Sequence, residues 1–335
     1  MPELTIAAGL ARGLMELAVA KGADRVVLSA QSGIRVEDLA DVDRRIPFAK
    51  YVRLMRAGQA LTHDPALALH YGETNDMADI SIVGLIAYTC ETMIEAMVQV
   101  NRYARLVVEF DGPKDRWTVV PRHGGIWAVD NRENPNDFPE LTESSLARMI
   151  CGPRRFGVTQ IAKAVHVTHK APAWRAEYER IYGAPVTFEA EWNAVQLDEK
   201  WMTHKIAVQP RYVFGILSEH ADALLKSLEN SKTARGRVES LLMPVLHTGE
   251  ASMDKIVGKL EVSRQTLFRQ LKAEGTTFEK VLDELRHRLA LQYLRGKKVS
   301  VNETAYLVGF SEPAAFSRAF KRWTGISPRE MRRES

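Results

Sequence analysis

The chain has 335 residues, more than the roughly 100 to 200 residues of one typical domain, so we expect at least two hydrophobic cores. Hydrophobic residues make up 45% and charged residues 26% of it, a balance that excludes a largely disordered or collagen-like protein. Its longest apolar stretch, Ile80–Cys90, is too short to span a bilayer, and its N-terminus lacks a signal-peptide pattern. We therefore expect no membrane partner and a cytoplasmic location.

Metal and cofactor motifs are absent from the sequence. Cys90 and Cys151 are its only cysteines and form no CxxC pair, which argues against a disulfide framework and a thiolate zinc site. We find no phosphate-binding loop, GxSxG, HExxH or dinucleotide motif. His166 and His169 lie on a predicted strand, where they would point to opposite faces, so we do not expect a shared metal. The sequence predicts no cofactor, no metal and no catalytic residues.

Helices dominate the beginning of the chain. Apolar residues at helical spacing predict helices at Leu4–Ala20 and Pro47–Leu61, and Asp64 followed by proline predicts the start of another. Thr92 and Glu95 form a capping-box pattern that opens a helix running to Val107.

Strands follow these helices. Residues that favour β-structure predict a hairpin of Arg116–Pro121 and Ile126–Asp130 around His123-Gly124-Gly125. Further strands are predicted at Ala164–Thr168 and Ala194–Leu197, and a helix is predicted at Pro172–Tyr182, ending at Gly183. Residues 1–230 should therefore form an α+β domain, whose strand order the sequence leaves open.

An amphipathic helix and a polar segment end this domain. The helix is predicted at Pro210–Leu228, with an apolar stripe of Val213, Leu217, Leu224 and Leu228. The stripe fits either a dimerisation surface or a helix that covers the core of its own domain. Glu229–Gly236 is polar and without periodicity, as linkers are, so a second domain should occupy residues 231–335.

The basic charge is concentrated near the C-terminus. Residues 235–335 carry 19 Lys and Arg against 12 Asp and Glu, a net charge of +7, whereas residues 1–234 carry 27 against 30, a net charge of −3. A basic segment on a mildly acidic body favours a polyanionic partner, with nucleic acid first among the candidates.

This basic region contains an internal repeat. Leu267, Arg269, Leu271 and Lys272 recur 49 positions later as Phe316, Arg318, Phe320 and Lys321. A short predicted helix and a turn precede each copy, at Met253–Leu260 and at Val301–Val308. Ser263 can cap the first long helix, Pro313 fits the first turn of the second, and Ser300 with Glu303 forms a capping box. The sequence therefore predicts two helix-turn-helix units.

Each repeated helix has an apolar face and a cationic face. At 100° per residue, Leu267 and Leu271 lie opposite Gln265 and Arg269, and Phe316, Phe320 and Trp323 lie opposite Ala314 and Arg318. An α-helix fits the DNA major groove, where Arg can pair with guanine, Gln with adenine, and an alanine methyl can touch thymine. Two copies with the same outward arginine favour DNA binding over an ordinary solvated helix.

A third helix should separate the two copies. Thr276 and Glu279 form another capping-box pattern, and leucines at helical spacing continue to Leu294. Phe278–Leu294 would span about 25 Å at 1.5 Å per residue, so it could hold two recognition helices near the ~34 Å spacing of successive major-groove segments.

The C-terminal region resembles the AraC/XylS family of bacterial transcription regulators. The matching residues are Gly309-Phe310-Ser311, Phe316, Phe320-Lys321, Gly325, Ser327-Pro328 and Met331-Arg332, together with Arg286, Ala290 and Leu294 in the predicted spacer helix. The resemblance covers roughly residues 235–333. It implies an all-α domain of seven helices with two helix-turn-helix motifs, binding to double-stranded DNA, homodimers and an N-terminal effector domain. RNA polymerase is a further candidate partner.

The resemblance also assigns DNA contacts by position. Base-reading positions of the family fall on Gln265, Phe268 and Arg269 in the first recognition helix and on Pro313, Ala314 and Arg318 in the second. Phosphate contacts fall on Arg264, Lys272, Lys321 and Arg322. Two departures stand out: Glu261 occupies a turn position where glycine is common, and Pro313 and Ala314 offer no side-chain hydrogen bond.

The N-terminal part resembles, less specifically, the arabinose-binding type of effector domain found in this family. The matching residues are Tyr182-Gly183-Ala184-Pro185-Val186-Thr187-Phe188, Asn193, Val195 and Leu197-Asp198. The resemblance implies a sequence-specific transcription regulator controlled by a small-molecule effector, whose identity and binding residues the sequence leaves open. The alternatives are an enzyme-like domain fused to a DNA-binding module and a non-specific architectural DNA-binding protein.

Overall fold

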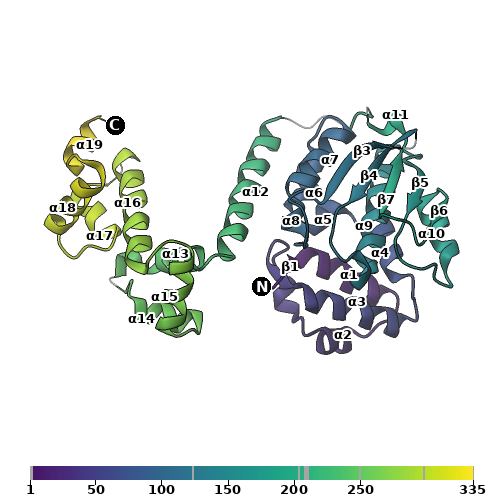
Figure 1. The fold of residues 1–335 in the computed structure, drawn as a ribbon, viewed down its shortest axis with the longest axis horizontal. Helices are drawn as coiled ribbons and strands as arrows, with labels where there is room; N and C mark the ends of the chain where they lie inside the picture. The colour runs from purple at the N-terminus through teal and green to yellow at the C-terminus, as the bar shows by residue number, and fades with distance from the viewer. Residues whose placement is uncertain are drawn as a thin grey trace. The chain divides into compact units, whose positions relative to one another are not determined.

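The computed structural model describes residues 3–122, 124–202, 204–206, 211–248, 250–296 and 299–334 and divides into two compact units, 1–225 and 226–335 (Figure 1). The first unit combines helices with two sheets, and the second is helical in its described part. Each has its own hydrophobic core. Among the described residues, no helix combines the length and the apolar character needed to cross a bilayer.

The helices of the first unit agree with most of the predicted ones. The helix predicted at Pro47–Leu61 is observed one residue later, and the helix predicted to run to Val107 is interrupted at Tyr103. In chain order the helices are α1 (Ala8–Ala20), α2 (Arg25–Ser32), α3 (Phe48–Thr62), α4 (Leu67–Thr74), α5 (Met77–Ile80), α6 (Ile82–Tyr88), α7 (Met93–Arg102), α8 (Ala104–Val107), α9 (Pro139–Cys151), α10 (Arg175–Tyr182), α11 (Glu199–Met202) and α12 (Arg211–Ser231). Short 3-10 helices lie at Val36–Leu39, Pro135–Asp137 and Gly152–Phe156.

The first predicted helix is wrong at its start. Residues Thr5–Ala7 form strand β1, which pairs antiparallel with β2 (Arg45–Pro47). The backbone N–H of Thr5 donates to Glu109 at 3.0 Å, and the Arg45 guanidinium donates to the Thr5 carbonyl at 2.9 Å. These partners are distant in sequence, and they override the local helical spacing.

Two predicted helix starts are confirmed in part. The Thr92 hydroxyl accepts from the Glu95 N–H at 3.3 Å, but the Glu95 carboxylate accepts from Glu91 instead of closing the predicted box. The Asp64 carboxylate accepts from the Ala66 N–H at 3.1 Å, one turn ahead of α4. The predicted Pro172–Tyr182 helix begins only at Arg175.

The main sheet has five strands in the order β3-β4-β7-β5-β6. The predicted hairpin is confirmed as β3 (Trp117–Arg122) and β4 (Gly125–Asp130), although His123 in its turn lies outside the described residues. Strand β7 (Ala194–Leu197) is observed at its predicted place and lies between β4 and β5 (Ala162–His166). Strand β6 (Val186–Thr187) pairs parallel with β5. Because β5 ends at His166, His169 does not lie on the strand where we predicted it.

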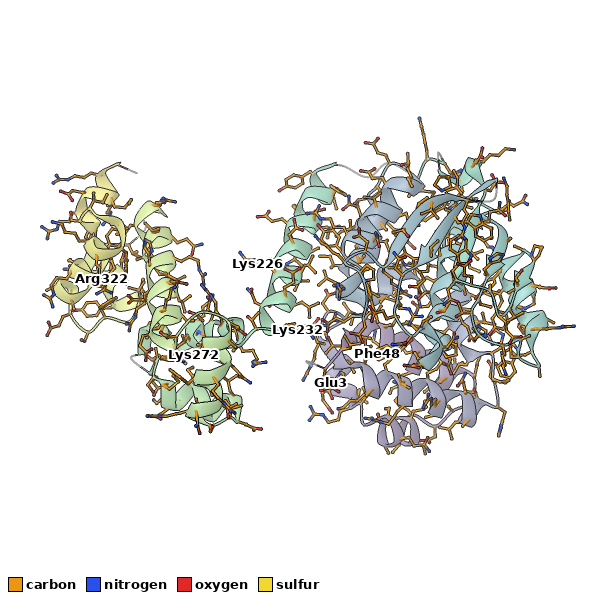
Figure 2. All side chains as sticks on the ribbon, in the orientation of Figure 1. Glu3, Phe48, Lys226, Lys232, Lys272 and Arg322 are labelled. Atoms are coloured by element: carbon orange, nitrogen blue, oxygen red, sulfur yellow. The ribbon has the colours of Figure 1, made fainter. Side chains whose placement is uncertain are left out.

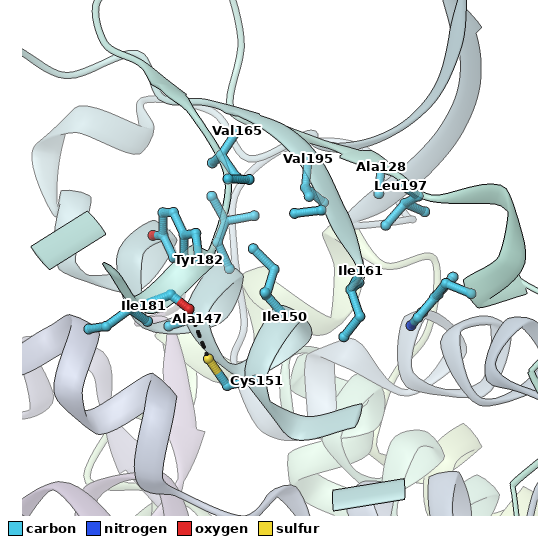
Figure 3. Close-up of a cluster of buried hydrophobic side chains, with 14 of the residues drawn as sticks. Ala128, Ala147, Ile150, Cys151, Ile161, Val165, Ile181, Tyr182, Val195 and Leu197 are labelled. Carbon is cyan, nitrogen blue, oxygen red and sulfur yellow. Dashed lines mark hydrogen bonds between the residues drawn. The ribbon is translucent and has the colours of Figure 1, made fainter. Parts of the chain in front are cut away.

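The core of the first unit forms where α9 and α10 pack on this sheet. Figure 3 shows Val165, Val195 and Leu197 from the strands facing Ile150 from α9 and Tyr182 from α10. At the edge of this cluster, the Cys151 thiol donates to the Ile181 carbonyl with 3.5 Å between the atoms. Both cysteines are buried and form no disulfide among the described residues, as expected for small core residues.

A buried hydrogen bond also joins α9 to α10. The Tyr178 hydroxyl donates to Glu143 Oε1 at 2.5 Å, and the His169 Nε2 atom lies 3.8 Å from the same oxygen. Burial raises the pKa of Glu143 to about 7, although the Tyr178 hydrogen bond opposes this shift. Glu143 therefore changes its charge within the folded protein near neutral pH.

The second unit begins within α12, at Lys226, and contains α13 (Ala234–Leu242), α14 (Met253–Leu260), α15 (Arg264–Ala273), α16 (Phe278–Gly296), α17 (Val301–Leu307), α18 (Pro313–Thr324) and α19 (Pro328–Glu334). The predicted linker Glu229–Gly236 is wrong, because α12 runs to Ser231 and α13 begins at Ala234. Thr233 caps α13 by accepting from the Gly236 N–H at 2.9 Å. The Glu274 carboxylate accepts from the N–H groups of Ala234 and Arg235. These contacts, which composition does not reveal, order the polar segment.

The two predicted helix-turn-helix units are confirmed. Ser263 caps α15 by accepting from the Thr266 N–H at 3.1 Å, Ser300 and Glu303 form the predicted capping box of α17, and Pro313 opens α18. The cap of α16 is wrong by one position, because Thr277, and not Thr276, accepts from the Lys280 N–H. Leu267, Leu271, Phe316 and Phe320 contribute to one common core.

The first prediction concerns Glu143. A carboxyl whose pKa is raised by folding stabilises the protein below its unfolded pKa of about 4.5, and this contribution is lost as pH rises through about 7. The change amounts to roughly 3 kcal/mol. Glu143→Gln should remove this part of the pH dependence of the melting temperature of the first unit, measured by calorimetry. Parallel profiles for the wild type and the variant would contradict it.

The second prediction concerns the turn between α14 and α15. Glu261 ends α14 with a φ of 53°, in the left-handed region, where a residue with a Cβ atom is strained by about 1 kcal/mol. Glu261→Gly should therefore stabilise the second unit by about 1 kcal/mol, measured as a rise in its melting temperature. Glu279→Gly, in the first turn of α16, is the control and should not stabilise. Equal effects of both changes would contradict strain at Glu261.

Candidate DNA interface and effector cavity

The two recognition helices α15 and α18 each bury one face and expose the other. Leu267 and Leu271 of α15 are buried, as are Phe316, Ala319 and Phe320 of α18. The predicted base-reading residues lie away from these faces: Gln265, Phe268, Arg269, Ala314 and Arg318 are exposed, and Pro313 is half-buried in the first turn of α18. This is the separation of faces that the repeat predicts.

The arginines at the repeated position are available for a ligand. Among the described residues, Arg269 and Arg318 have neither a hydrogen-bond partner nor an ion-pair partner, and both are exposed. Phe268, next to Arg269, leaves 53% of its surface exposed, so its ring is open to an apolar contact. An arginine fork and an apolar ring on one helix face can contact guanine and the thymine methyl group.

The predicted phosphate contacts fall into two kinds. Lys272 and Lys321 are exposed and have no ion-pair partner in the part of the chain that the structure describes. Arg264 pairs with Asp254, and Arg322 pairs with Asp283 at 2.6 Å (Lys272 and Arg322 are labelled in Figure 2). Exposed pairs of this kind contribute at most about 1 kcal/mol, so either arginine can exchange its partner for a phosphate.

The spacer helix α16 holds the second unit together. It contacts α13 as well as α17, α18 and α19, and it buries Ala290 and Leu294. Arg286 donates to the carbonyls of Val308 at 3.1 Å and Gly309 at 3.0 Å, and its guanidinium lies 4.7 Å from the Phe310 ring.

The turn between α17 and α18 requires a glycine at position 309. Gly309 has a φ of 80°, and a Cβ atom there would lie 2.3 Å from the Leu246 carbonyl oxygen. Together with the Arg286 contacts, this close approach fixes the turn that leads into α18. The resemblance names Arg286, but sequence reasoning did not find its partners.

The first unit contains an apolar cavity of about 160 Å³. Its walls come mainly from α7, α9 and the 3-10 helix Gly152–Phe156 and include Met93, Met97, Met149, Trp117 and Trp201. Polar groups are few, among them Asn75, Ser145 and Arg148. A mostly apolar cavity with a few polar groups is typical of a small-molecule site.

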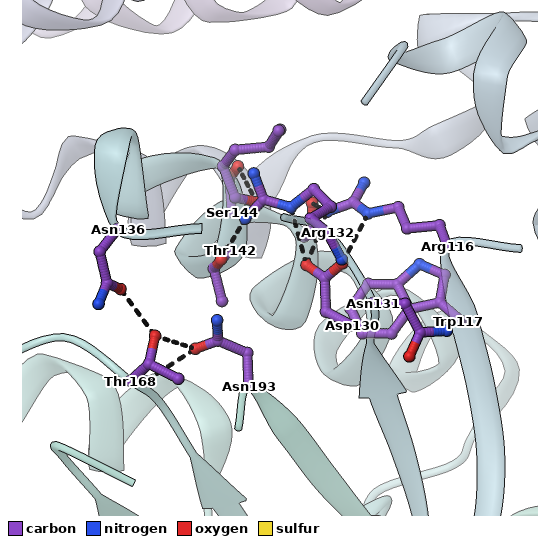
Figure 4. Close-up of polar contacts among 12 residues, drawn as sticks. Arg116, Trp117, Asp130, Asn131, Arg132, Asn136, Thr142, Ser144, Thr168 and Asn193 are labelled. Carbon is purple, nitrogen blue, oxygen red and sulfur yellow. Dashed lines mark hydrogen bonds and ion pairs between the residues drawn. The ribbon is translucent and has the colours of Figure 1, made fainter. Parts of the chain in front are cut away.

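A buried charge cluster borders this cavity. Arg116 and Arg132 both pair with Asp130, at 3.3 and 3.0 Å, and Arg116 also donates to the Ser145 hydroxyl at 2.9 Å (Figure 4). Burial alone would raise the pKa of Asp130, but the two guanidinium groups outweigh burial and lower it. Asp130 therefore stays ionised and neutralises part of this cluster.

Arg148 differs from its neighbours. It is 9% exposed, and its guanidinium carbon lies 5.2 Å from the centre of the Tyr71 ring. Its Nε and Nη2 atoms are buried without a hydrogen-bond partner in the described structure. This site could not be predicted from local patterns, because Ser145 and Arg148 become cavity residues only through the packing of α9.

Comparison with known proteins identifies both units. Residues 22–206 match the model of the arabinose-binding domain of AraC transcription regulators, and residues 256–334 match a helix-turn-helix domain model. The chain is 27% identical to the ornithine utilization regulator of Pseudomonas aeruginosa over 96% of this chain and 94% of that protein. It is 26% identical to the transcriptional regulator VirS of Mycobacterium tuberculosis, over 87% and 85%.

A solved structure, the transcriptional regulator CdpR from Pseudomonas aeruginosa, covers 79% of this chain and 86% of its own, at 24% identity and a TM-score of 0.36. The matched domain models cover both units, and the relatives match nearly the whole chain. The chain belongs to the AraC family of transcription regulators, with a DNA-binding helix-turn-helix unit and an N-terminal effector domain of the arabinose-binding type.

Proposed function

We propose that this regulator recognises specific DNA sequences through both recognition helices. Arg269 and Arg318 provide the main base contacts, supported by Gln265, Phe268, Pro313 and Ala314. The observation that carries this proposal is that both arginines occupy the same position of a repeated helix and lack any partner among the described residues. Because an exposed guanidinium can bond guanine O6 and N7 together, each helix can read its own groove segment.

Phosphate contacts by Lys272, Lys321, Arg264 and Arg322 would set the position of the unit on the duplex. The 19 residues of α16 span about 28 Å at 1.5 Å per residue. This length fits two helices that enter successive major-groove segments of one DNA face. The basic excess of residues 235–335 supports such a contact.

We further propose that the regulator acts as a homodimer in the cytoplasm and that RNA polymerase is among its partners. On α12, Tyr212, Val213 and Ile216 are exposed, which supports a role of this helix in dimerisation. The helix also serves its own chain, because Leu228 of the predicted stripe is buried and Phe214, which lies outside the stripe, packs on the core of the first unit. Effector binding in the first unit would shift the population of the DNA-competent arrangement.

We propose that the chain binds and does not catalyse. Glu143 is the kind of perturbed acid that an enzyme would require, and it lies in a cleft of about 730 Å³. Among the described residues that line this cleft there is no serine or cysteine, and Glu143 already accepts a hydrogen bond from the Tyr178 hydroxyl. Among the described residues, no three side chains are grouped to hold a metal ion.

Selection of genomic fragments tests this function directly. The purified full chain should retain a small set of fragments that share a sequence, and metabolites from a cell extract should change the retained amount. Retention of all fragments in proportion to their length would instead support an architectural protein. Substrate turnover by the chain without DNA would support the fused-enzyme alternative.

The third prediction concerns base readout. Arg269→Ala and Arg318→Ala should each weaken binding to the selected fragment by about 1 to 3 kcal/mol and relax the base preference in one part of the site. Fluorescence anisotropy titrations on the selected and a scrambled duplex measure both effects. Arg56→Ala, an exposed arginine of the first unit, is the charge-matched control and should change neither. Equal losses on both duplexes would argue against base readout.

The fourth prediction concerns phosphate contacts. Lys321→Ala should weaken binding to selected and scrambled duplexes alike, because a phosphate contact carries no sequence information. It should also lower the slope of log affinity against log salt by about one. Salt titration of the wild type and the variant measures this slope. An unchanged slope would refute a phosphate contact at Lys321.

A further inference from the structure

We propose that the effector is a monocarboxylate whose anionic group pairs with Arg148 while its apolar body fills the cavity of the first unit. This inference rests on the proposed effector control and adds the chemical class of the ligand. It depends on three features of the structure: an apolar cavity, one uncompensated cation in its wall, and the packing that holds this cation in place.

The arginines that line the cavity differ in their partners. Arg116 shares the Asp130 carboxylate with Arg132, and Arg155 pairs with Asp76 and also donates to the Thr74 carbonyl at 3.2 Å. Arg148 has no carboxylate partner among the described residues, although it is more than nine-tenths buried. Arg148 is therefore the wall cation that is left to pair with a ligand anion.

An unpaired buried charge is costly, so its presence requires a reason. A buried cation without a counter-ion loses its hydration and gains no compensating hydrogen bonds. Tyr71 contacts Arg148 through its ring, 5.2 Å from the ring centre, and through its hydroxyl, but neither contact gives the Arg148 Nε and Nη2 atoms an acceptor in the described structure. A ligand carboxylate would supply both the missing charge and the missing acceptors, because its two oxygens match the guanidinium fork.

Close helix packing keeps Arg148 in place. Helix α9 lies so near α4 that a Cβ atom on Gly72 would be 2.3 Å from the Ser144 carbonyl oxygen. Ser145 and Arg148 are one turn apart on α9, so they share a face of the helix. Both line the cavity, and Arg116 anchors the Ser145 hydroxyl. The anion site is therefore organised before the ligand binds.

The size and lining of the cavity limit the body of the ligand. Its volume of about 160 Å³ is close to the roughly 150 Å³ of an engineered apolar cavity that holds benzene. Methionines, aromatic rings and small or branched aliphatic side chains, Ile206 among them, form most of the wall. A body of about six carbon atoms fits this space, as in hexanoate or benzoate. A phosphate ester would bring a second charge, whereas the other described arginines of the wall, Arg116 and Arg155, already have carboxylate partners.

The fifth prediction is carboxylate selectivity of the full chain. Trp117 and Trp201 line the cavity, so their fluorescence reports binding there. The probes are the monocarboxylates from butanoate to decanoate and benzoate, with hexanamide and hexylamine as neutral and cationic controls of matched shape. A medium-length carboxylate or benzoate should bind about thirty-fold or more tightly than its neutral control. Lack of saturable binding by every carboxylate at millimolar concentration, or equal binding of amide and carboxylate, would overturn the proposal.

Variants of Arg148 test whether its guanidinium pairs with the ligand carboxylate. Arg148→Met should weaken carboxylate binding about thirty-fold or more and leave hexanamide binding nearly unchanged. Arg148→Lys keeps the charge and should bind the carboxylate with intermediate affinity, which a purely structural role would not produce. Arg56→Gln is the control and should bind normally, since Arg56 is an exposed arginine of the first unit that does not line the cavity. Normal binding by Arg148→Met, or a larger loss in Arg56→Gln, would overturn the assignment.

The melting temperature adds a readout that does not require a ligand. Replacement of an unpaired buried charge by an apolar side chain should leave the melting temperature of the unliganded protein unchanged or raise it. A lower melting temperature together with unchanged carboxylate selectivity would show a structural role and contradict the proposal. DNA binding in the same samples separates two failures: lost carboxylate selectivity with intact sequence preference overturns only this inference, whereas lost sequence preference overturns the proposed DNA recognition.

Discussion

The burial of one face of each repeated helix is the constraint on which the DNA-binding unit depends. Leu267 and Leu271 anchor α15, and Phe316 and Phe320 anchor α18, in a core that both helices share with α16. Since an α-helix cannot rotate without exposing its buried residues, this anchoring determines which side chains point outward. For this reason the side chains of Arg269 and Arg318 point into solvent. Neither has a hydrogen-bond or ion-pair partner in the described structure that would compete with DNA.

In the first unit, some arginines are buried, in contrast to the exposed Arg269 and Arg318 of the second unit. Arg116 and Arg132 share the carboxylate of Asp130, so their charges help to hold the sheet and α9 together. Arg148 lies near them without such a carboxylate. A buried cation that destabilises the unliganded protein is well suited to effector control, because a ligand of opposite charge removes this destabilisation. If the ligand binds the DNA-competent state and the other state with different affinities, it shifts the population between them.

Local patterns predicted much of the structure, because their causes are local. Caps at Ser263 and Ser300, the strained Glu261 turn and the β3–β4 hairpin all depend on residues within a few positions of each other. The predictions were wrong where residues distant in the sequence determine the local structure. Thr5 joins a strand because Arg45 and Glu109 bind it, and Ala234 starts a helix with help from Glu274. The cavity is the extreme case, since Arg148 and Trp201 meet only after folding.

The most direct test of the account is protection of guanine N7 from methylation on a selected DNA fragment. We expect protected guanines in two major-groove segments on one face of the duplex, about one helical turn apart. Arg269→Ala should remove protection in one segment, and Arg318→Ala should remove it in the other. Protection that is absent, or that stays the same in both variants, would contradict base recognition by the repeated helices.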